Sequence, residues 1–264
     1  MAGRGFSAYM SVAYVPVEEA IQRPGLRLVV VGNVPSPWGE AAKNILQLKL
    51  IPFVAVRLVY DNEALAGWAG QLSGPVAVYE REVPRSGWAE ILMLAERLAP
   101  EPALLPADPL LRSRALAIAD TFCREGGLGW VRRLQMVQAG LDKTGGFSER
   151  VAAYLGKKYG YDSAQAGSYG GRVRQLLGEL GAALRSARGQ GPYYLGRTMT
   201  AADIYSAAFM AMFMPLPEIH CTMHPASRAA FSWLDDETAA AIDPVLLEHR
   251  DMMYTKHLEL PLSL

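Results

Sequence analysis

The chain has 264 residues, 51% of them hydrophobic, and its 26 basic and 26 acidic residues give a formal net charge of zero at pH 7. A chain of this size and apolarity buries a large core, as one big domain or two modest ones, which excludes disorder. Neither the net charge nor any long basic run offers the positive field that attracts nucleic acid or an anionic membrane. Small molecules and other proteins remain as partners.

The cysteine content and the start of the chain indicate a cytoplasmic protein. Cys123 and Cys221 are too few for a disulfide framework, which fits a reducing compartment. The first 25 residues lack the unbroken apolar stretch of a signal peptide, and no run of about eighteen apolar residues occurs anywhere. We therefore expect a chain that is neither exported by that route nor membrane-spanning.

The first predicted elements form a strand, a helix and a second strand. Residues 26–32 (LRLVVVG) are rich in β-branched side chains and predict a buried strand. Ser36 stands where an N-cap belongs and Pro37 where a first helical residue belongs, and apolar residues then recur at helical spacing. Residues 53–60 predict a second strand, and the crossover between the two suits parallel pairing.

An irregular stretch, a hairpin and a helix come next. Residues 61–73 predict a weak helix or a loop, and the short extended runs 75–79 and 81–83 predict an antiparallel hairpin. Ser86 is expected to begin a further helix. Three prolines in residues 101–109 then predict a stiff linker between domains.

Everything after the linker has helical periodicity. The pattern covers residues 110–123, resumes at 130–139 and returns at 147–187. Later, Thr200 precedes Asp203 by three residues ahead of an apolar run, which predicts a structural capping box. The predicted organisation is therefore an N-terminal extension (1–25), an α/β domain (26–100), a linker (101–109) and an all-α domain (110–264).

Five of these features, in this order, resemble the glutathione transferase superfamily. Residues 36–43 (SPWGEAAK) are similar to its first-helix active-site turn, 74–76 (GPV) to its cis-proline loop, and 85–88 (RSGW) to the place of its Glu-Ser pair. Residues 104–109 resemble its interdomain linker, and 200–203 (TAAD) its late capping box. The likeness covers roughly residues 26–215 and implies a thioredoxin-like N-terminal domain followed by an all-α helical-bundle domain.

The resemblance implies that glutathione is the co-substrate and that Ser36 contacts its sulfur, with Asn33 as a secondary candidate. A thiol has a reference pKa of about 8.5, and lowering it by about two units needs roughly 2.7 kcal/mol. A hydroxyl donating to the anion supplies about 1.5–3 kcal/mol, and a helix N-terminus about 0.3–1 more. We expect the Ser36 hydroxyl to do this while also capping the helix amides; the alternative is a plain N-cap.

Further glutathione contacts are implied by the same resemblance. Gly74, a cis Pro75 and Val76 would pair with the cysteinyl part of glutathione, whereas the alternative is a trans proline opening an edge strand. Ser86 would offer its hydroxyl and the helix-start amides to the γ-glutamyl carboxylate, or serve only as an N-cap. Arg85 departs from the family pattern, which has an acidic residue there, and could pair with a ligand carboxylate or signal altered or lost glutathione binding.

The remaining assignments concern the first helix and the second domain. Trp38 is expected among the glutathione-binding residues, and Trp130 and Arg133 in the acceptor pocket, all by resemblance. No metal is expected: His220 and His224 have a possible ligand spacing, but prolines crowd them and no further ligands are evident. The apolar tail, residues 249–264, is expected to pack down, either closing the helical core or covering the acceptor pocket.

The sequence thus predicts a glutathione S-transferase-like enzyme that activates the glutathione thiol for attack on a small electrophile, and family members usually pair as homodimers. Three reactions use the same thiolate: conjugation (the reaction of detoxification), reduction and isomerisation. Two alternatives stay open: a non-catalytic protein that kept the fold for binding or scaffolding, and a glutathione-dependent reductase or isomerase. A thiol–disulfide oxidoreductase is disfavoured because the front domain contains no cysteine.

Overall fold

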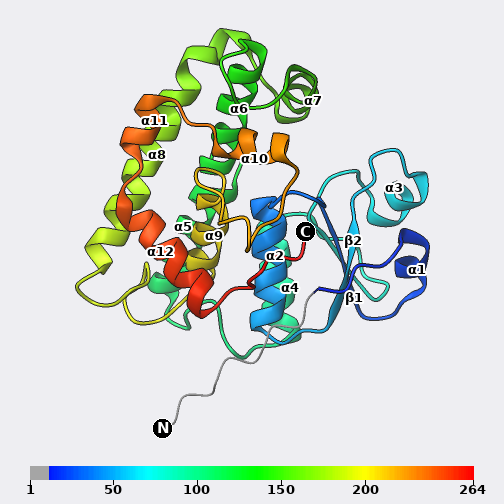
Figure 1. The fold of residues 1–264 in the computed structure, drawn as a ribbon. Helices are drawn as coiled ribbons and strands as arrows, with labels where there is room; N and C mark the ends of the chain where they lie inside the picture. The colour runs from blue at the N-terminus through cyan, green and yellow to red at the C-terminus, as the bar shows by residue number, and fades with distance from the viewer. Residues whose placement is uncertain (1–11) are drawn as a thin grey trace.

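The computed structural model describes residues 12–264, so the first part of the predicted N-terminal extension lies outside it. The chain forms two parts that lie side by side, a small sheet with helices on both faces and a bundle of helices (Figure 1). This is the predicted α/β thioredoxin-like part followed by an all-α part. No helix within the described residues is long and apolar enough to cross a membrane.

The sheet has three strands in the order β2-β1-β3. The central strand β1 (Leu26–Val30) pairs in parallel with β2 (Phe53–Arg57), as predicted, and antiparallel with β3 (Val76–Tyr79). A single parallel bridge from Tyr14 to Ala55 extends the sheet beyond β2. The described part of the N-terminal extension therefore adds one bridge to the sheet and then packs on it through α1 (Val17–Gln22).

Successive side chains of β1 point to opposite faces of the sheet, and each face packs against different helices. Leu28 and its like-facing neighbours pack against α2 (Pro37–Leu48) and α4 (Trp88–Leu98), which lie between the sheet and the helical part (Figure 1). Val29 faces the other way, toward α1 (Val17–Gln22) and α3 (Glu63–Ala69). The layer formed by α2 and α4 thus joins the two parts.

Two predictions around β3 are wrong. Residues 81–83 form a turn rather than a second hairpin strand, and one bridge between Ala77 and Arg85 is all that pairs there. Pro84, which has no N–H to donate to a ladder, explains the short pairing. The following helix begins at Trp88 with Gly87 as its N-cap, two residues after the expected start at Ser86.

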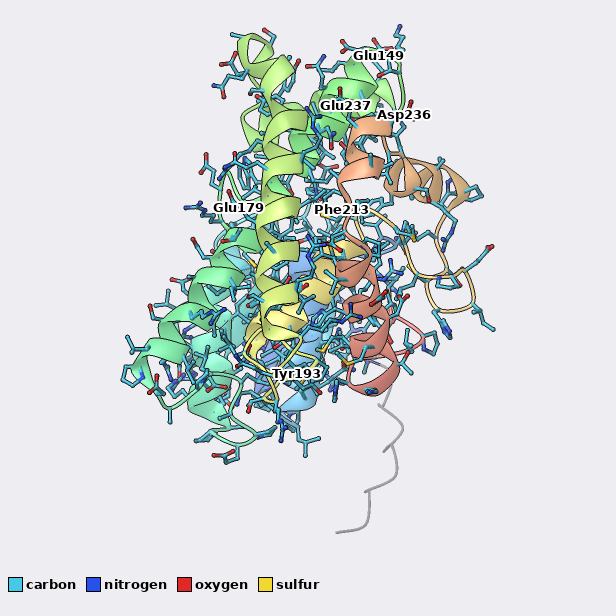
Figure 2. All side chains as sticks on the ribbon, turned by 90° about the vertical axis from the view of Figure 1, so that its left-hand side faces the viewer. Glu149, Glu179, Tyr193, Phe213, Asp236 and Glu237 are labelled. Carbon is cyan, nitrogen blue, oxygen red and sulfur yellow. The ribbon has the colours of Figure 1, made fainter. Side chains whose placement is uncertain are left out.

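The second part consists of helices, and α9 lies buried along its whole length at the centre, packed against α2, α5 and α12. The periodic region 147–187 is interrupted at Gly160, whose φ of 69° ends the first of its helices. Figure 2 looks onto α8, with the acidic Glu149, Asp236 and Glu237 at one end and Tyr193 near the other. The helices are α5 (Pro109–Cys123), α6 (Leu128–Leu141), α7 (Glu149–Tyr159), the 3-10 turn η1 (Ser163–Gln165), α8 (Ala166–Ala187), α9 (Ala201–Met210), α10 (Pro225–Ser232), α11 (Asp236–Ala241) and α12 (Pro244–Lys256).

The start of α9 is organised around a buried carboxylate, that of Asp203. It accepts hydrogen bonds from the Thr200 amide at 2.8 Å, the Thr200 hydroxyl at 3.0 Å and the Tyr194 amide at 2.9 Å, and lies 3.0 Å from Nε2 of His249. Thr200 is the N-cap, as predicted. The capping box that it forms with Asp203 is confirmed, and its hydroxyl also donates to the Asp203 carboxylate.

Candidate functional site

The turn before α2 presents a hydroxyl that no described residue uses. Ser36 is the N-cap of α2 and Pro37 its first residue, as predicted. The Ser36 side chain makes no bond to the helix amides, so the expected capping role is wrong. The residue is 5% exposed. Asn33 is exposed and has a φ of 62°, a left-handed conformation that Asn tolerates better than most residues.

The loop before β3 lies against the end of β1. The Gly74–Pro75 peptide bond is cis, as the resemblance implied. A Cβ at Gly74 would lie 3.3 Å from the amide nitrogen of Val31 and 3.4 Å from Cα of Val30, so glycine permits this close approach. The loop and the Ser36 turn therefore both lie at the carboxyl end of β1, while Val76 is buried inside β3.

Trp38 joins the first turn of α2 to the helical part. Its indole Nε1–H donates to the carbonyl oxygen of Cys123 at 3.0 Å, and its ring meets Phe209 edge to face with centroids 4.8 Å apart. These contacts fix the direction in which the start of α2 points. The indole N–H is therefore engaged in a hydrogen bond that links the two parts of the chain. The predicted contact between Trp38 and glutathione stays a prediction, and only the indole ring could make it.

Arg133 of α6 lies inside a cage of aromatic rings. Its guanidinium carbon is 5.9 Å from the ring centroid of Trp38, 5.8 Å from Tyr159, 5.7 Å from Phe231 and 6.0 Å from Phe147. The residue is 7% exposed. Among the described residues, none accepts a hydrogen bond from Arg133 or forms an ion pair with it, and its Nε is buried without a partner. The structure thus brings Arg133 of α6 into contact with Trp38, which lies in the first turn of α2.

Trp130, the other predicted acceptor-pocket residue, packs beside this cage. Its indole N–H donates to the carbonyl oxygen of Tyr159 at 3.1 Å, and the two rings meet edge to face at 4.7 Å. Trp130 therefore positions Tyr159, which in turn faces Arg133.

Residues from both parts meet near the cage, and the sequence analysis missed them. Tyr60, just after β2, has its ring centroid 5.5 Å from that of Tyr154 on α7, and Nζ of Lys158 lies 5.6 Å from the Tyr60 ring. Burial, reinforced by Tyr154, raises the pKa of Tyr60 to about 12, so its hydroxyl stays protonated. Burial, and then the nearby Arg133, lowers the pKa of Lys158. The spacing of Tyr154 and Lys158, one helical turn apart, was a usable signal.

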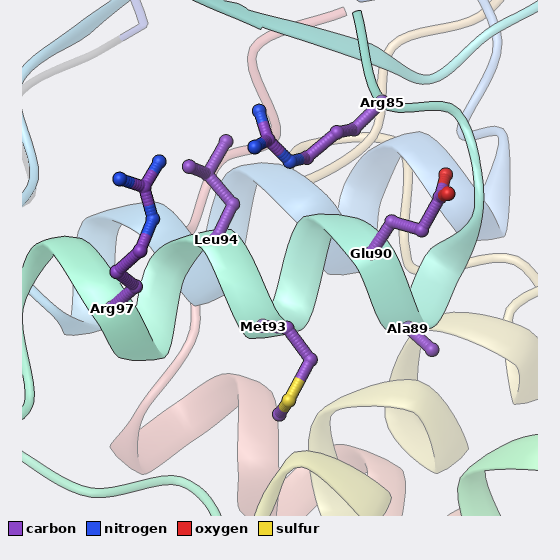
Figure 3. Close-up of a pocket in the computed structure, with 6 residues that line it drawn as sticks. All are labelled: Arg85, Ala89, Glu90, Met93, Leu94 and Arg97. Atoms are coloured by element: carbon purple, nitrogen blue, oxygen red, sulfur yellow. The ribbon is translucent and has the colours of Figure 1, made fainter. Parts of the chain in front are cut away.

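Ser86 and Arg85 lie just before α4, where Arg85 pairs with Ala77 of β3, two residues after Pro75. The carboxylate of Glu90 accepts from the amides of Ser86 and Gly87, the donors expected to hold a ligand carboxylate. Arg85 forms an ion pair with Glu82 at 2.7 Å. An open hollow of about 410 Å³ lies along α4, and no described contact joins it to Ser36. Figure 3 shows the side chains that line it. Its lining residues are Arg85, Ala89, Glu90, Met93, Leu94 and Arg97.

A buried ionic cluster on the flank of α2 holds the tail of the chain. Lys43 is completely buried, pairs with Glu40 at 2.9 Å and donates to the carbonyl oxygen of Ser263. The amide of Glu259 donates to the side chain of Asn44 at 2.8 Å. The tail therefore packs down, as predicted. Its first part, residues 249–256, is the end of α12 and closes the helical core against α9, whereas residues 259–263 contact α2 of the sheet part.

The two cysteines and His224 have roles in the fold: the cysteines are buried, and His224 caps a helix. Both cysteines are buried; burial raises the pKa of Cys123 well above its usual range and that of Cys221 to about 11. His224 is the N-cap of α10, with Nδ1 accepting from the Ala226 amide at 3.2 Å. Within residues 12–264, no three potential metal ligands gather.

Comparisons with known proteins identify the fold. No protein-family model and no curated protein matches the sequence. Solved structures do match: a glutathione S-transferase from Methylobacterium radiotolerans in complex with glutathione sulfonate is 18% identical, with 88% of this chain and 91% of that chain covered and a TM-score of 0.58. A glutathione transferase homologue from Sulfitobacter with bound glutathione is 14% identical, with 89% and 94% covered and a TM-score of 0.57. A glutathione S-transferase from Xanthobacter autotrophicus is 17% identical, with 89% and 96% covered and a TM-score of 0.55.

Proposed function

We propose that this chain, which has the glutathione transferase fold, binds glutathione at the carboxyl end of β1 and uses Ser36 to hold its sulfur as the thiolate. The Gly74–Pro75 loop would pair with the cysteinyl backbone, and the exposed Asn33 would be a second donor near the sulfur. The similar structures from Methylobacterium and Sulfitobacter, which contain glutathione sulfonate and glutathione, support the choice of ligand.

The observation that carries the proposal is the uncommitted hydroxyl of Ser36 at the positive end of α2. Since this hydroxyl caps no helix amide, its hydrogen and lone pairs remain for a ligand. A hydroxyl donating to a thiolate contributes about 1.5–3 kcal/mol, and the helix end about 0.3–1 kcal/mol more. Together these match the roughly 2.7 kcal/mol that a two-unit fall in the thiol pKa requires.

The electrophile would lie between the two parts, against the helical side. Trp38 connects the Ser36 turn to the ring cage of Arg133, and Trp130 supports that cage through Tyr159. An electrophile in contact with these side chains would be within reach of a thiolate at Ser36. Addition, displacement and isomerisation would all begin with the same attack by sulfur.

One observation favours a second candidate, a binding protein without catalysis. The α4 amides expected to hold the γ-glutamyl carboxylate are held by Glu90, and Arg85 is paired with Glu82. A ligand carboxylate would have to displace Glu90, which weakens glutathione binding and with it any chemistry that depends on it.

We also propose that the chain forms a homodimer through the exposed sides of α4 and α5. Leu110 is 81% exposed at the start of α5, and Leu111 and Met93 are exposed near it. The guanidinium of Arg112 lies 3.8 Å from the Met93 sulfur, which places the two helices side by side there. An apolar patch of this kind on a surface helix pair is typical of protein interfaces.

Calorimetric titration with glutathione, followed by an assay with generic electrophiles, tests the enzymatic proposal. We expect binding at millimolar glutathione or below, and turnover that Ser36→Ala reduces by about 10- to 100-fold. Binding without turnover would contradict the role proposed for Ser36. No binding heat at millimolar glutathione would favour the non-catalytic candidate.

A further inference from the structure

Arg133 differs from the other buried arginines of the described chain in having no acceptor. Arg27 donates to the carbonyl oxygen of Gly25 at 2.7 Å, and Arg132 to the side-chain oxygen of Gln135 at 2.7 Å. Arg250 donates to the neighbouring Asp251 carboxylate at 2.7 Å. A buried guanidinium is always charged and carries five N–H donors, so leaving it without acceptors is costly unless something else supplies them.

The ring cage offsets only part of this cost. Cation–π contacts attract the charge to the faces of rings, but they accept no directed hydrogen bonds from the guanidinium edge. The Nε of Arg133 is buried and has no partner among the described residues. The cage therefore orients the guanidinium and leaves its donors for another group.

A second cation, Lys158, lies near Arg133 and forms no ion pair with an acidic residue of the described chain. Lys158 is half-buried, forms no ion pair among the described residues, and has its pKa lowered by burial and then by Arg133. Two like charges held close together in a partly buried site of low dielectric repel each other. The protonated hydroxyl of Tyr60 is hydrogen-bonded with Tyr154, so the two cations that are unpaired within the described chain, Arg133 and Lys158, are the groups that favour an anion.

We infer that Arg133 and Lys158 form a receptor for the anionic group of the acceptor, so that the electrophile of this enzyme is a carboxylate-bearing small molecule. The inference rests on the proposed function, because the contact between Arg133 and Trp38 places the receptor beside the Ser36 turn. Arg133 would bind one face of the carboxylate through paired N–H groups, and Lys158 would act as a point charge at the more open side.

The reaction step itself does not consume the anion. In a displacement, the glutathione sulfur forms a bond to the electrophilic carbon, the leaving group departs with its bonding pair, and the thiol proton passes to solvent. The carboxylate is unchanged and serves to hold the acceptor so that its reactive carbon faces the sulfur.

Binding of two preformed conjugates tests the inference without requiring turnover. S-(carboxybenzyl)glutathione carries a carboxylate on the ring, whereas S-benzylglutathione does not. We expect the full chain to bind the carboxylate conjugate more tightly by calorimetry. Arg133→Met should weaken that conjugate about 10- to 100-fold and leave the benzyl conjugate and glutathione within about twofold. Arg133→Lys should restore part of the preference.

Lys158→Gln provides a second variant at a less buried position, in case Arg133→Met does not fold. It should weaken only the carboxylate conjugate, by about three- to tenfold, while the matched Lys157→Gln on the exposed side of the same helix should change neither. Equal losses for both conjugates would overturn the inference, since Arg133 would then only support the fold. Equal losses that extend to free glutathione would assign the anion to the tripeptide that all three ligands share, and would also overturn it.

The two proposals fail in different ways. If neither conjugate nor glutathione binds, the proposed function is wrong. Titration with benzoate alone then tests the anion receptor separately: binding that depends on Arg133 would support the receptor, and no binding would contradict it. If glutathione binds but the two conjugates are not distinguished, the function stands and the inference about the substrate class is wrong.

Discussion

The carboxylate of Glu90 accepts a hydrogen bond from the backbone amide of Gly87 at 2.9 Å, so the amino-terminal end of α4 already holds an anion supplied by the chain. The Ser86 amide contacts the same oxygen at 3.3 Å. This arrangement caps the helix well. It also places Glu90 in competition with any ligand carboxylate that would use the same two amides.

Replacing Glu90 should therefore improve glutathione binding at a cost in stability. We expect Glu90→Ala to lower the Kd for glutathione about two- to fivefold and to destabilise the fold by about 0.3–1 kcal/mol. Calorimetry and urea denaturation measure the two effects. Glu149→Ala, which removes another first-turn acid from α7, is the control and should leave the Kd unchanged. Weaker glutathione binding in Glu90→Ala would show that the carboxylate assists the ligand.

The start of α9 should be far more sensitive to Asp203 than to Thr200. Asp203→Ala leaves three buried donors of Thr200 and Tyr194 unpaired, at about 1–3 kcal/mol each, so we expect a loss above about 3 kcal/mol. Thr200→Ala removes one hydroxyl and should cost about 1 kcal/mol. Chemical denaturation measures both losses. Similar losses for the two variants would contradict the role given to the carboxylate.

The buried Glu40 should make stability depend on pH. Burial raises its pKa to about 7, with Lys43 opposing the rise and Glu259 adding to it. An unfolded glutamate titrates near about 4.3, so between these values the folded chain binds more protons than the unfolded one. The stabilisation from this proton is therefore full below about pH 4 and is lost as the pH rises through about 7.

Comparing Glu40→Gln with the native chain isolates this contribution. The stability of the native chain relative to the variant should fall between about pH 5 and about pH 8, as measured by urea denaturation. Glu63→Gln, at an exposed position on α3, is the control and should show no such trend. Parallel pH profiles for the native chain and Glu40→Gln would mean that Glu40 stays ionised throughout.

Local patterns were enough to predict most of the architecture. The β-branched run before Gly32, the Ser36–Pro37 helix start and the prolines before Pro109 each specify structure within a few residues, and the structure follows them. The hairpin was misjudged because Pro84 cannot donate to a ladder, and the start of α4 because Glu90, four residues after Ser86, accepts from the amides and moves the cap to Gly87.

Contacts between distant segments could not be predicted in this way. The sequence placed Arg133 near the acceptor by resemblance alone, and its cage joins rings from residues 38, 147, 159 and 231. The bond from Lys43 to Ser263 spans nearly the whole chain. Such pairs depend on tertiary packing, which no local periodicity encodes.

The proposed homodimer predicts that a charge on the exposed patch separates the subunits. Leu110→Glu should halve the mass seen by light scattering during gel filtration, because an unpaired carboxylate would have to be buried in the interface. Leu50→Glu is a matched control, since Leu50 is 85% exposed in the turn after α2 and is not in α4 or α5, and it should keep the native mass. A monomeric native chain would contradict the dimer.

The central claim is that the Ser36 hydroxyl holds glutathione as its thiolate. The most direct test follows the ultraviolet absorbance of the thiolate of bound glutathione across pH, for the native chain and for Ser36→Ala. We predict a thiol pKa about two units below the free value of about 8.5 in the native chain, and a return most of the way to that value in Ser36→Ala, with a smaller change in Asn33→Ala. The same titration curve in the native chain and in Ser36→Ala would contradict the claim.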